Sequence, residues 1–245
     1  MTPEALVAAA CPKINALGPA FYFTPETRTV GKDFGLDGFR FYFLGRGGVL
    51  GDTSARVVHS AFGYFHPDLV TRLWDSGAEK VAPKTAALAF TEACADHGRS
   101  KLASSLDLEE FCTAAQAVVE AADPDGLALF AGILGQPLAA DAPARAAQLI
   151  AVLREFRGSA HLIAVRAAGL ATSTAHFIKR PDDAETFGWP KDSAATVTDA
   201  DRVKLDAAEA ITDALVTPAF AVLDEAGQAA LLAGLAAVEA AYAAG

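Results

Sequence analysis

The chain has 245 residues, of which 52% are hydrophobic, and its formal net charge is −10. Duplex DNA would repel such a chain unless it carried a local basic face, so nucleic acid is not an expected partner. No run of 18 or more purely apolar residues is present, so we expect no membrane span. The first residues, MTPEALVAAACPK, lack the basic start of a signal peptide, which predicts a cytoplasmic protein.

Signals for the starts of helices follow one another along the chain. Most of them combine a capping side chain with a proline or an acid in the first turn. They predict helices that begin near Thr24-Pro25-Glu26, Asp52-Thr53-Ser54, His66-Pro67-Asp68, Pro83, Asp107, Pro143, and Asp199 or Asp201. A break is predicted at Thr217-Pro218, and residues 181–198 are predicted to form a loop.

Signals for strands are weak. Residues 19–23 and 39–43 are aromatic but short, and we interpret the second segment as a buried helical turn. The fold is therefore expected to be mainly α, with only minor β structure.

No metal site is expected. The three cysteines are widely spaced and form no CxxC pair, which is typical of small buried apolar residues. His59 and His66 are separated by the helix start at Pro67, so they should not share a face. His97 and His176 are interpreted as surface residues. No nucleotide-binding or zinc motif is present, so the cofactor, if any, stays unknown.

A short internal echo links the two halves of the chain. Gly35 and Gly169 are each followed by leucine, and eleven residues after each glycine comes an arginine, Arg46 or Arg180. Chance can produce a match of this length. If the echo is a true repeat, it predicts two similar helical lobes related by a pseudo-twofold axis.

Charged residues interrupt the apolar segment LREFRGSAH, residues 153–161. On a helix, Arg154, Arg157 and His161 stand at positions i, i+3 and i+7 and share one face. Two interpretations stay open. In the first, the arginines are exposed and pair with Glu155 or another acid, and His161 is a hydrogen-bonded core histidine. In the second, the stripe faces a pocket and the guanidinium groups hold a carboxylate or another anion.

The first half offers possible partners for this stripe. If the two lobes are related, Glu26 and Arg28 approach the pseudo-axis together with the stripe. The rings of Tyr22, Phe23 and Tyr42, with their aromatic neighbours, would then form apolar walls of a small-molecule site. The alternative for these rings is an ordinary core.

Several segments resemble a known family. FTPETR, FLGRGGVLGD and VVHSAFGYFHPDLV are similar to the N-terminal half of a largely uncharacterised actinobacterial family of helix-turn-helix-like proteins. LREFRGSAH resembles its mid-chain motif Arg-Glu-His-Arg-Gly-Asp-Gly-His, with Phe156 in place of the middle histidine. VTDADRVKLDAAEAITDAL resembles the end of a MarR-type winged helix. The resemblance implies two degenerate winged-helix-like lobes, residues 1–125 and 126–245, with β structure in the wings and a homodimer formed through the terminal helices.

The sequence departs from this family at the expected DNA-reading helix. In the family, a Gly-Trp pair is followed by an acidic helix that corresponds to the recognition helix of MarR proteins. Here Gly188-Trp189 continues through PKDSAAT directly into Val197. Reading a DNA sequence needs a helix or a ribbon in the major groove, so its loss predicts that DNA reading is lost as well.

Three functions are therefore expected, in order of preference. The first is a small-molecule binding protein that holds an apolar or aromatic ligand with an anionic group in a pocket between the lobes. The second is an enzyme on the same scaffold, with His161 as general acid or base and Arg157 or Glu26 steering charge. The third is a transcription regulator that binds DNA through the first lobe, using a helix over residues 53–62.

Overall fold

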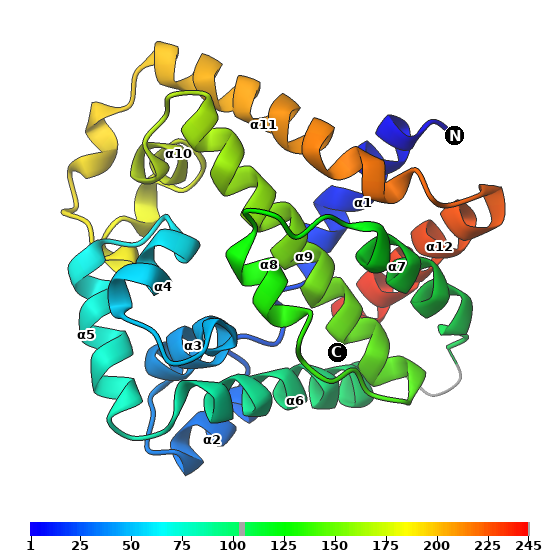
Figure 1. Ribbon diagram of the computed structural model, residues 1–245, viewed down its shortest axis with the longest axis horizontal. Helices are drawn as coiled ribbons and strands as arrows, with labels where there is room; N and C mark the ends of the chain where they lie inside the picture. Colours follow the sequence, from blue (N-terminus) through cyan, green and yellow to red (C-terminus); the bar gives the residue numbers. More distant parts are fainter. Residues whose placement is uncertain (103–105, 245) are drawn as a thin grey trace.

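The structure, a computed structural model, describes residues 1–102 and 106–244, which form helices joined by short turns (Figure 1). The α-helices are α1 (Pro3–Leu17), α2 (Pro25–Asp33), α3 (Gly38–Gly47), α4 (Ala55–Phe62), α5 (Pro67–Ala78), α6 (Pro83–Lys101), α7 (Glu109–Ala121), α8 (Ala128–Ile133), α9 (Ala142–Ala167), α10 (Thr172–Lys179), α11 (Asp199–Phe220) and α12 (Glu225–Ala244). Short 3-10 helices are η1 (Gly48–Leu50), η2 (Pro181–Asp183), η3 (Glu185–Phe187) and η4 (Ser193–Thr196).

The prediction of a mainly α fold is confirmed. The prediction of minor β structure is wrong for the described residues, which contain no strand. The segment that follows α10, predicted to form a loop, folds into the separate 3-10 turns η2, η3 and η4. Its prolines and closely spaced turns leave no run of extended backbone that could pair into a sheet.

Capping side chains start several helices where the sequence predicts them. The side chain of Thr24 accepts a hydrogen bond from the backbone of α2, and the side chain of His66 does the same for α5. Thr198 and Asp201 form a reciprocal capping box at the start of α11. These interactions satisfy N–H groups that the first turn of a helix leaves without partners.

α7 begins at Glu109, two residues after the predicted position Asp107, and no side chain caps its first turn. The break predicted at Thr217-Pro218 is wrong. α11 continues past Pro218 to Phe220. A proline this close to the end of a helix affects only the last turn, so the break comes after it.

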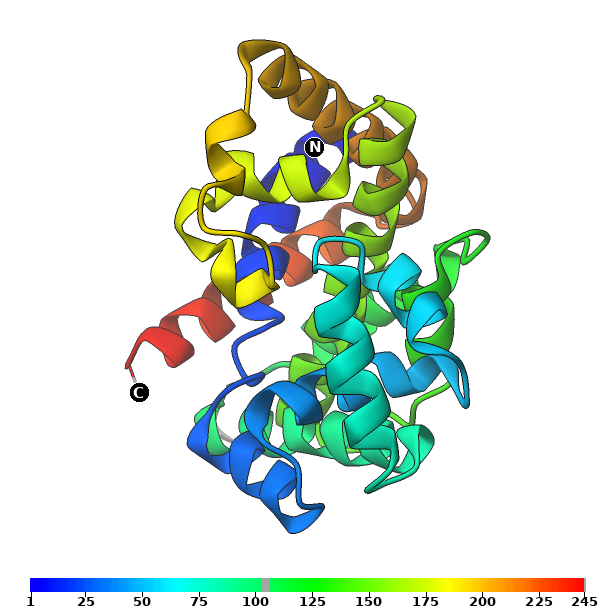
Figure 2. The same ribbon diagram turned by 90° about the vertical axis from the view of Figure 1, so that its left-hand side faces the viewer.

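Three hydrophobic cores share α9. The first is built from α1, α7, α9, α11 and α12, and the second from α3 to α6 with many aromatic rings. A third, smaller core joins the end of α9 to α10 and α11. α9 places Leu153 and Phe156 in the first core and Ala147 and Ala151 in the second. α1 and α12 pack against each other although they come from opposite ends of the chain (Figure 2). The lobe boundary at residue 125 stays a prediction, and the first core combines helices from both sides of it.

The two members of the sequence echo form the same turn. Gly35 follows α2 with φ 71°, and Gly169 follows α9 with φ 69°. In each turn the N–H of the next residue, Leu36 or Leu170, donates to the carbonyl five residues earlier, at 2.9 and 3.1 Å. Both leucines are buried, and α3 or α10 begins two residues later. This is the glycine-ended helix terminus that favours a positive φ.

One helix in the described part of the chain, α12, is long and apolar enough to cross a membrane by length and composition. A core helix can meet the same criterion. Leu231, Leu235 and Val238 of α12 are fully buried in the first core, where α12 packs against α7 and α1.

Candidate functional site

A cleft of about 560 Å³ lies between α9, α10 and the second core. Its volume is in the range of roughly 300–1,000 Å³ that is typical of small-molecule sites. α9 lines the cleft with Arg154, Arg157, Gly158, Ser159 and His161. α10 and the residue after it line the cleft with Ala175, His176, Lys179 and Arg180.

Part of the lining is a continuous series of aromatic rings. The ring of Phe23 lies 5.5 Å from that of Phe39 and 5.4 Å from that of Tyr42, between centroids. Tyr42 contacts Phe65 at 6.1 Å, and Phe65 stacks on Phe187 at 4.2 Å. We call these five residues the ring wall. All five line the cleft and give it an aromatic, largely apolar surface.

Six of the eight side chains predicted for the site line this cleft: Tyr22, Phe23, Tyr42, Arg154, Arg157 and His161. Glu26 and Arg28 do not. Both are exposed on α2, which packs mainly against α3 and α6 rather than against α9. The expected approach of Glu26 and Arg28 to the stripe on α9 is therefore not found.

A buried carboxylate organises one end of the stripe. Glu155 is only 2% exposed and accepts two hydrogen bonds from Arg46, both at 2.8 Å. It also accepts from Arg154 at 2.9 Å and from the hydroxyl of Tyr22 at 3.2 Å. Arg46 donates in addition to Tyr42 at 3.0 Å. We call this set the Glu155 network; it joins α3, α9 and the segment before α2.

Burial raises the pKa of Glu155, but the charges of Arg46 and Arg154 and the hydrogen bonds outweigh it and lower the pKa to about 2. The carboxylate therefore stays ionised. The two guanidinium groups also lie over rings: Cζ of Arg46 is 4.4 Å from the centroid of Phe62, and Cζ of Arg154 is 5.3 Å from that of Tyr22. One acid against two arginines leaves one positive charge at this end of the cleft.

A second polar network joins α9, α10 and α11. Arg157 donates to Glu209 at 2.8 Å and to Asp213 at 3.2 Å. Lys179 forms an ion pair with the other oxygen of Glu209. Burial raises the pKa of Glu209, but the hydrogen bonds from Lys179 and Arg157 outweigh it and lower the pKa to about 2. Neither acid lines the cleft, so both stand behind the cations.

The hydrogen bonds of His161 assign its neutral tautomer. Its Nδ1 lies 2.9 Å from the hydroxyl oxygen of Thr212, and that hydroxyl donates its one proton to the carbonyl of Ala208 at 2.7 Å. Nδ1 must therefore carry the hydrogen and donate to Thr212. Burial lowers the pKa of His161. The neutral ring keeps the lone pair on Nε2, where it can accept a proton.

The cleft is basic although the chain is acidic. Its lining holds five cationic side chains, Arg46, Arg154, Arg157, Lys179 and Arg180, and one carboxylate, Asp183. Glu155, Glu209 and Asp213 pair with these cations from behind the lining, so the five cations and four acids leave one positive charge. Cationic groups at the surface of a confined, partly apolar site favour an anionic group on any molecule that enters it.

Gly158 lies on the cleft side of α9 with nothing near it. A Cβ built there would meet no atom within 4 Å, and α9 continues through it without interruption. The glycine therefore neither admits a neighbouring helix nor kinks α9. A glycine inside a helix costs about 0.5–1 kcal/mol relative to alanine. At this position it leaves the helix backbone open toward the cleft.

The sequence analysis missed three contributors to this site. Arg46 was noticed only as a member of the echo, and its partner in the echo, Arg180, lines the same cleft. His176, which was expected at the surface, is only 7% exposed and also lines it. The matched Gly-Leu and arginine spacing of the echo was the sequence signal that could have linked Arg46 with Arg180.

A family model described as a helix-turn-helix family matches residues 7–245. Neither the curated proteins nor the solved structures contain a match to the chain. The matched range includes every residue that lines the cleft.

Proposed function

The chain belongs to this helix-turn-helix family, and on that scaffold we propose that it binds a small organic molecule in the cleft beside α9. One observation carries the proposal: a hollow of about 560 Å³ combines the ring wall with an excess of cationic side chains. Apolar sites with a few convergent polar groups are the usual form of small-molecule sites. The preferred ligand has an apolar or aromatic body and an anionic group.

Gly158 provides the sharpest test, because it lines the cleft and a Cβ there would meet no atom within 4 Å. We expect Gly158→Leu to fold with equal or greater stability, since leucine favours the helix over glycine by most of about 1 kcal/mol. We also expect it to lose binding of the fluorescent apolar probe N-phenylnaphthylamine (NPN). The measurement is an NPN fluorescence titration of both proteins, with the melting temperature of each as a control for folding.

Saturable NPN binding by the wild type and none by a stable Gly158→Leu variant would support the cleft as the site. Equal NPN affinity in the two proteins would overturn it, because the probe would then bind elsewhere. Absence of NPN binding to the wild type would also count against an apolar ligand.

Catalysis on the same scaffold is a second candidate, favoured by the state of His161. Its neutral ring has Nδ1–H bonded to Thr212 and a lone pair on Nε2, as a general base requires. Arg157 beside it would steer charge. The molecule found in the cleft would then be converted by the wild type, and His161→Ala would lose turnover while keeping its affinity.

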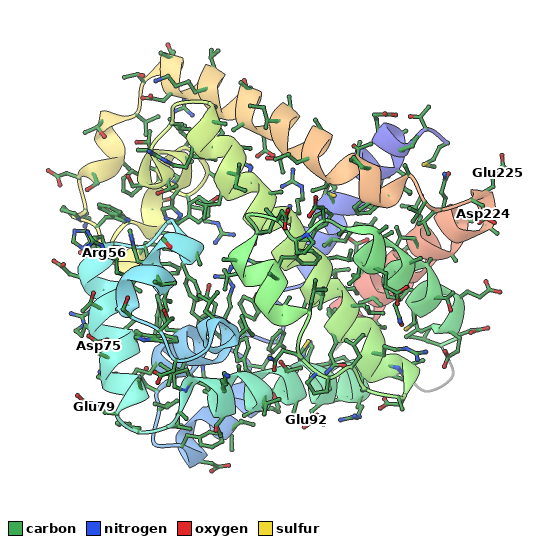
Figure 3. The ribbon with its side chains drawn as sticks, viewed as in Figure 1. Arg56, Asp75, Glu79, Glu92, Asp224 and Glu225 are labelled. Atoms are coloured by element: carbon green, nitrogen blue, oxygen red, sulfur yellow. The ribbon has the colours of Figure 1, made fainter. Side chains whose placement is uncertain are left out.

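DNA binding is a third candidate, favoured by the description of the family. The first-lobe helix expected to contact DNA is α4, which exposes Arg56. Acidic side chains of the adjoining α5, Asp75 and Glu79, lie on the same side of the molecule and would oppose a phosphate backbone (Figure 3). A gel shift that weakens steeply with salt would support this candidate, and no shift at low salt would remove it.

We also propose that the two halves descend from one repeated helix-turn-helix unit of the winged-helix type. The matching turns at Gly35 and Gly169 support this, as does the convergence of Arg46 and Arg180 on one cleft. A homodimer is proposed through the terminal helices, where α11 leaves Val203 68% exposed. Sedimentation velocity of the full chain tests the dimer.

A further inference from the structure

We infer that the acid group of the ligand binds at α10, to His176 and Arg180, while its flat aromatic body lies along the ring wall. This inference rests on the proposed function and names the ligand class: a planar aromatic molecule with one acidic group. It moves the anion subsite away from Arg157 and His161, where the sequence analysis placed it.

The stripe on α9 has already committed much of its hydrogen-bonding capacity. Arg157 uses Nη2 for both Glu209 and Asp213. Arg154 uses Nη1 for Tyr22 and Glu155, and His161 uses Nδ1 for Thr212. These bonds hold the helices together, so a ligand that took the same protons would have to replace an existing partner, although Nε of Arg157 is also buried without a partner.

His176 is in the opposite situation. It is 93% buried, lines the cleft, and its Nε2 has no hydrogen-bond partner among the described residues. A buried polar atom without a partner is costly, and such atoms in native proteins often mark a place for a ligand or a water. Ser159, which also lines the cleft, has a buried hydroxyl oxygen in the same condition.

Two cations accompany His176 in the cleft lining. Lys179 is the last residue of α10, and Arg180 directly follows the helix in a non-helical conformation. Lys179 is paired with Glu209. Arg180 takes part in none of the ion pairs found between described residues. The carboxylate of the cleft lining that is closest to it in the sequence is Asp183. Arg180 is therefore the cation with the most capacity for an incoming acid.

The ring wall leads to this subsite. Phe187, its last member, lies 3.8 Å from the ring of His176, between centroids. Ring contacts therefore continue without interruption from Phe39 through Tyr42 and Phe65 to His176. A flat molecule that lies on this surface with its polar end toward α10 brings an acid group to His176 and Arg180, and offers its apolar body to the rings.

The test compares two probes that differ by one acid group. Anilinonaphthalene sulfonate (ANS) carries a sulfonate, and NPN is the same ring system without it. Two variants remove donors at α10: His176→Phe keeps a ring against Phe187 but lacks the N–H, and Arg180→Gln lacks the charge. Each should lower the affinity for ANS about ten- to a hundredfold, the value of a hydrogen bond to a charged group, and leave the affinity for NPN unchanged.

Arg28→Gln serves as the charge-matched control, because Arg28 is exposed on α2 and does not line the cleft; it should change neither affinity. The inference is overturned if the α10 variants weaken ANS and NPN equally, or if they leave ANS unchanged. In the second case, NPN binding that is lost in Gly158→Leu would keep the cleft as the ligand site and remove only the subsite. If the wild type binds neither probe, both proposals fail.

Discussion

Replacement of Glu155 by glutamine is expected to lower the free energy of unfolding by about 3–5 kcal/mol, the usual cost of removing one partner of a buried ion pair. The amide has nearly the same shape as the carboxylate but no charge. It would leave Arg46 and Arg154 in the protein interior without an acid, and it would place an NH₂ group against guanidinium donors. Equilibrium unfolding in urea measures the loss.

Glu92→Gln is the matched control. Glu92 also pairs with an arginine, Arg99, but its side chain is 61% exposed and lies on the outer surface of α6 (Figure 3). Exposed pairs contribute about 0–1 kcal/mol. Equal losses in the two variants, or a loss below about 1 kcal/mol for Glu155→Gln, would show that the Glu155 network does not hold α3 and α9 together.

The pH dependence of stability provides a second test of the Glu155 network. The pKa of Glu155 is about 2 in the folded protein against an ordinary value of 4.5. A lowered folded pKa stabilises the protein above the unfolded value, and this contribution is lost as the pH falls from 4.5 toward 2. The stability difference between the wild type and Glu155→Gln should therefore shrink over that interval.

Gly45→Ala is the second substitution with a large expected effect, because it separates α6 from α3, the helix that carries Tyr42 and Arg46 into the cleft. A Cβ at Gly45 would lie 2.5 Å from both Cβ and Cγ of Phe90 on α6. These atoms are close to the backbone, so rotation of the Phe90 ring cannot relieve the contact. α3 must move away from α6, at a cost of about 1–3 kcal/mol or more. Arg46, the next residue, would move with it and weaken its pair with Glu155.

We expect Gly45→Ala to lower both the midpoint of urea unfolding and the affinity for NPN. Gly158→Ala is the control, since the same added methyl group meets no atom within 4 Å there. It should raise the free energy of unfolding by about 0.5–1 kcal/mol through helix propensity alone. A Gly45→Ala protein as stable as the wild type would contradict the packing of α3 on α6.

The start of a helix was predictable from the sequence where a capping side chain next to it determines that start. Thr24 and Thr198 cap the N–H groups of their own first turns, so three neighbouring residues are enough to identify each start. The start of α7 at Glu109 has no such side-chain cap, so the acid at Asp107 located it only to within two residues. The continuation of α11 past Pro218 depends on packing rather than on the local sequence.

Only the side of the site that α9 forms was predictable from the sequence. Helical spacing places Arg154, Arg157 and His161 on one face, and the structure brings that face to the cleft. The partner of Glu155, Arg46, lies 109 residues away along the chain, and no periodicity joins them.

The burial of His176 also depends on distant contacts. Phe187 stacks on it, and the segment that carries Phe187 is held by two hydrogen bonds: His66 N–H to the Phe187 carbonyl at 2.8 Å, and the Trp189 indole to the Tyr64 carbonyl at 2.9 Å. The sequence showed that segment only as a loop, so it gave no reason to expect a buried histidine.

Native mass spectrometry of the full chain, freshly purified, tests most directly whether the cleft beside α9 holds a small molecule. The wild type should show the mass of the chain plus one small organic molecule, and Gly158→Leu, prepared identically, should show the mass of the chain alone. The same bound mass in both proteins, or an unmodified chain mass in both, would contradict a ligand site in this cleft.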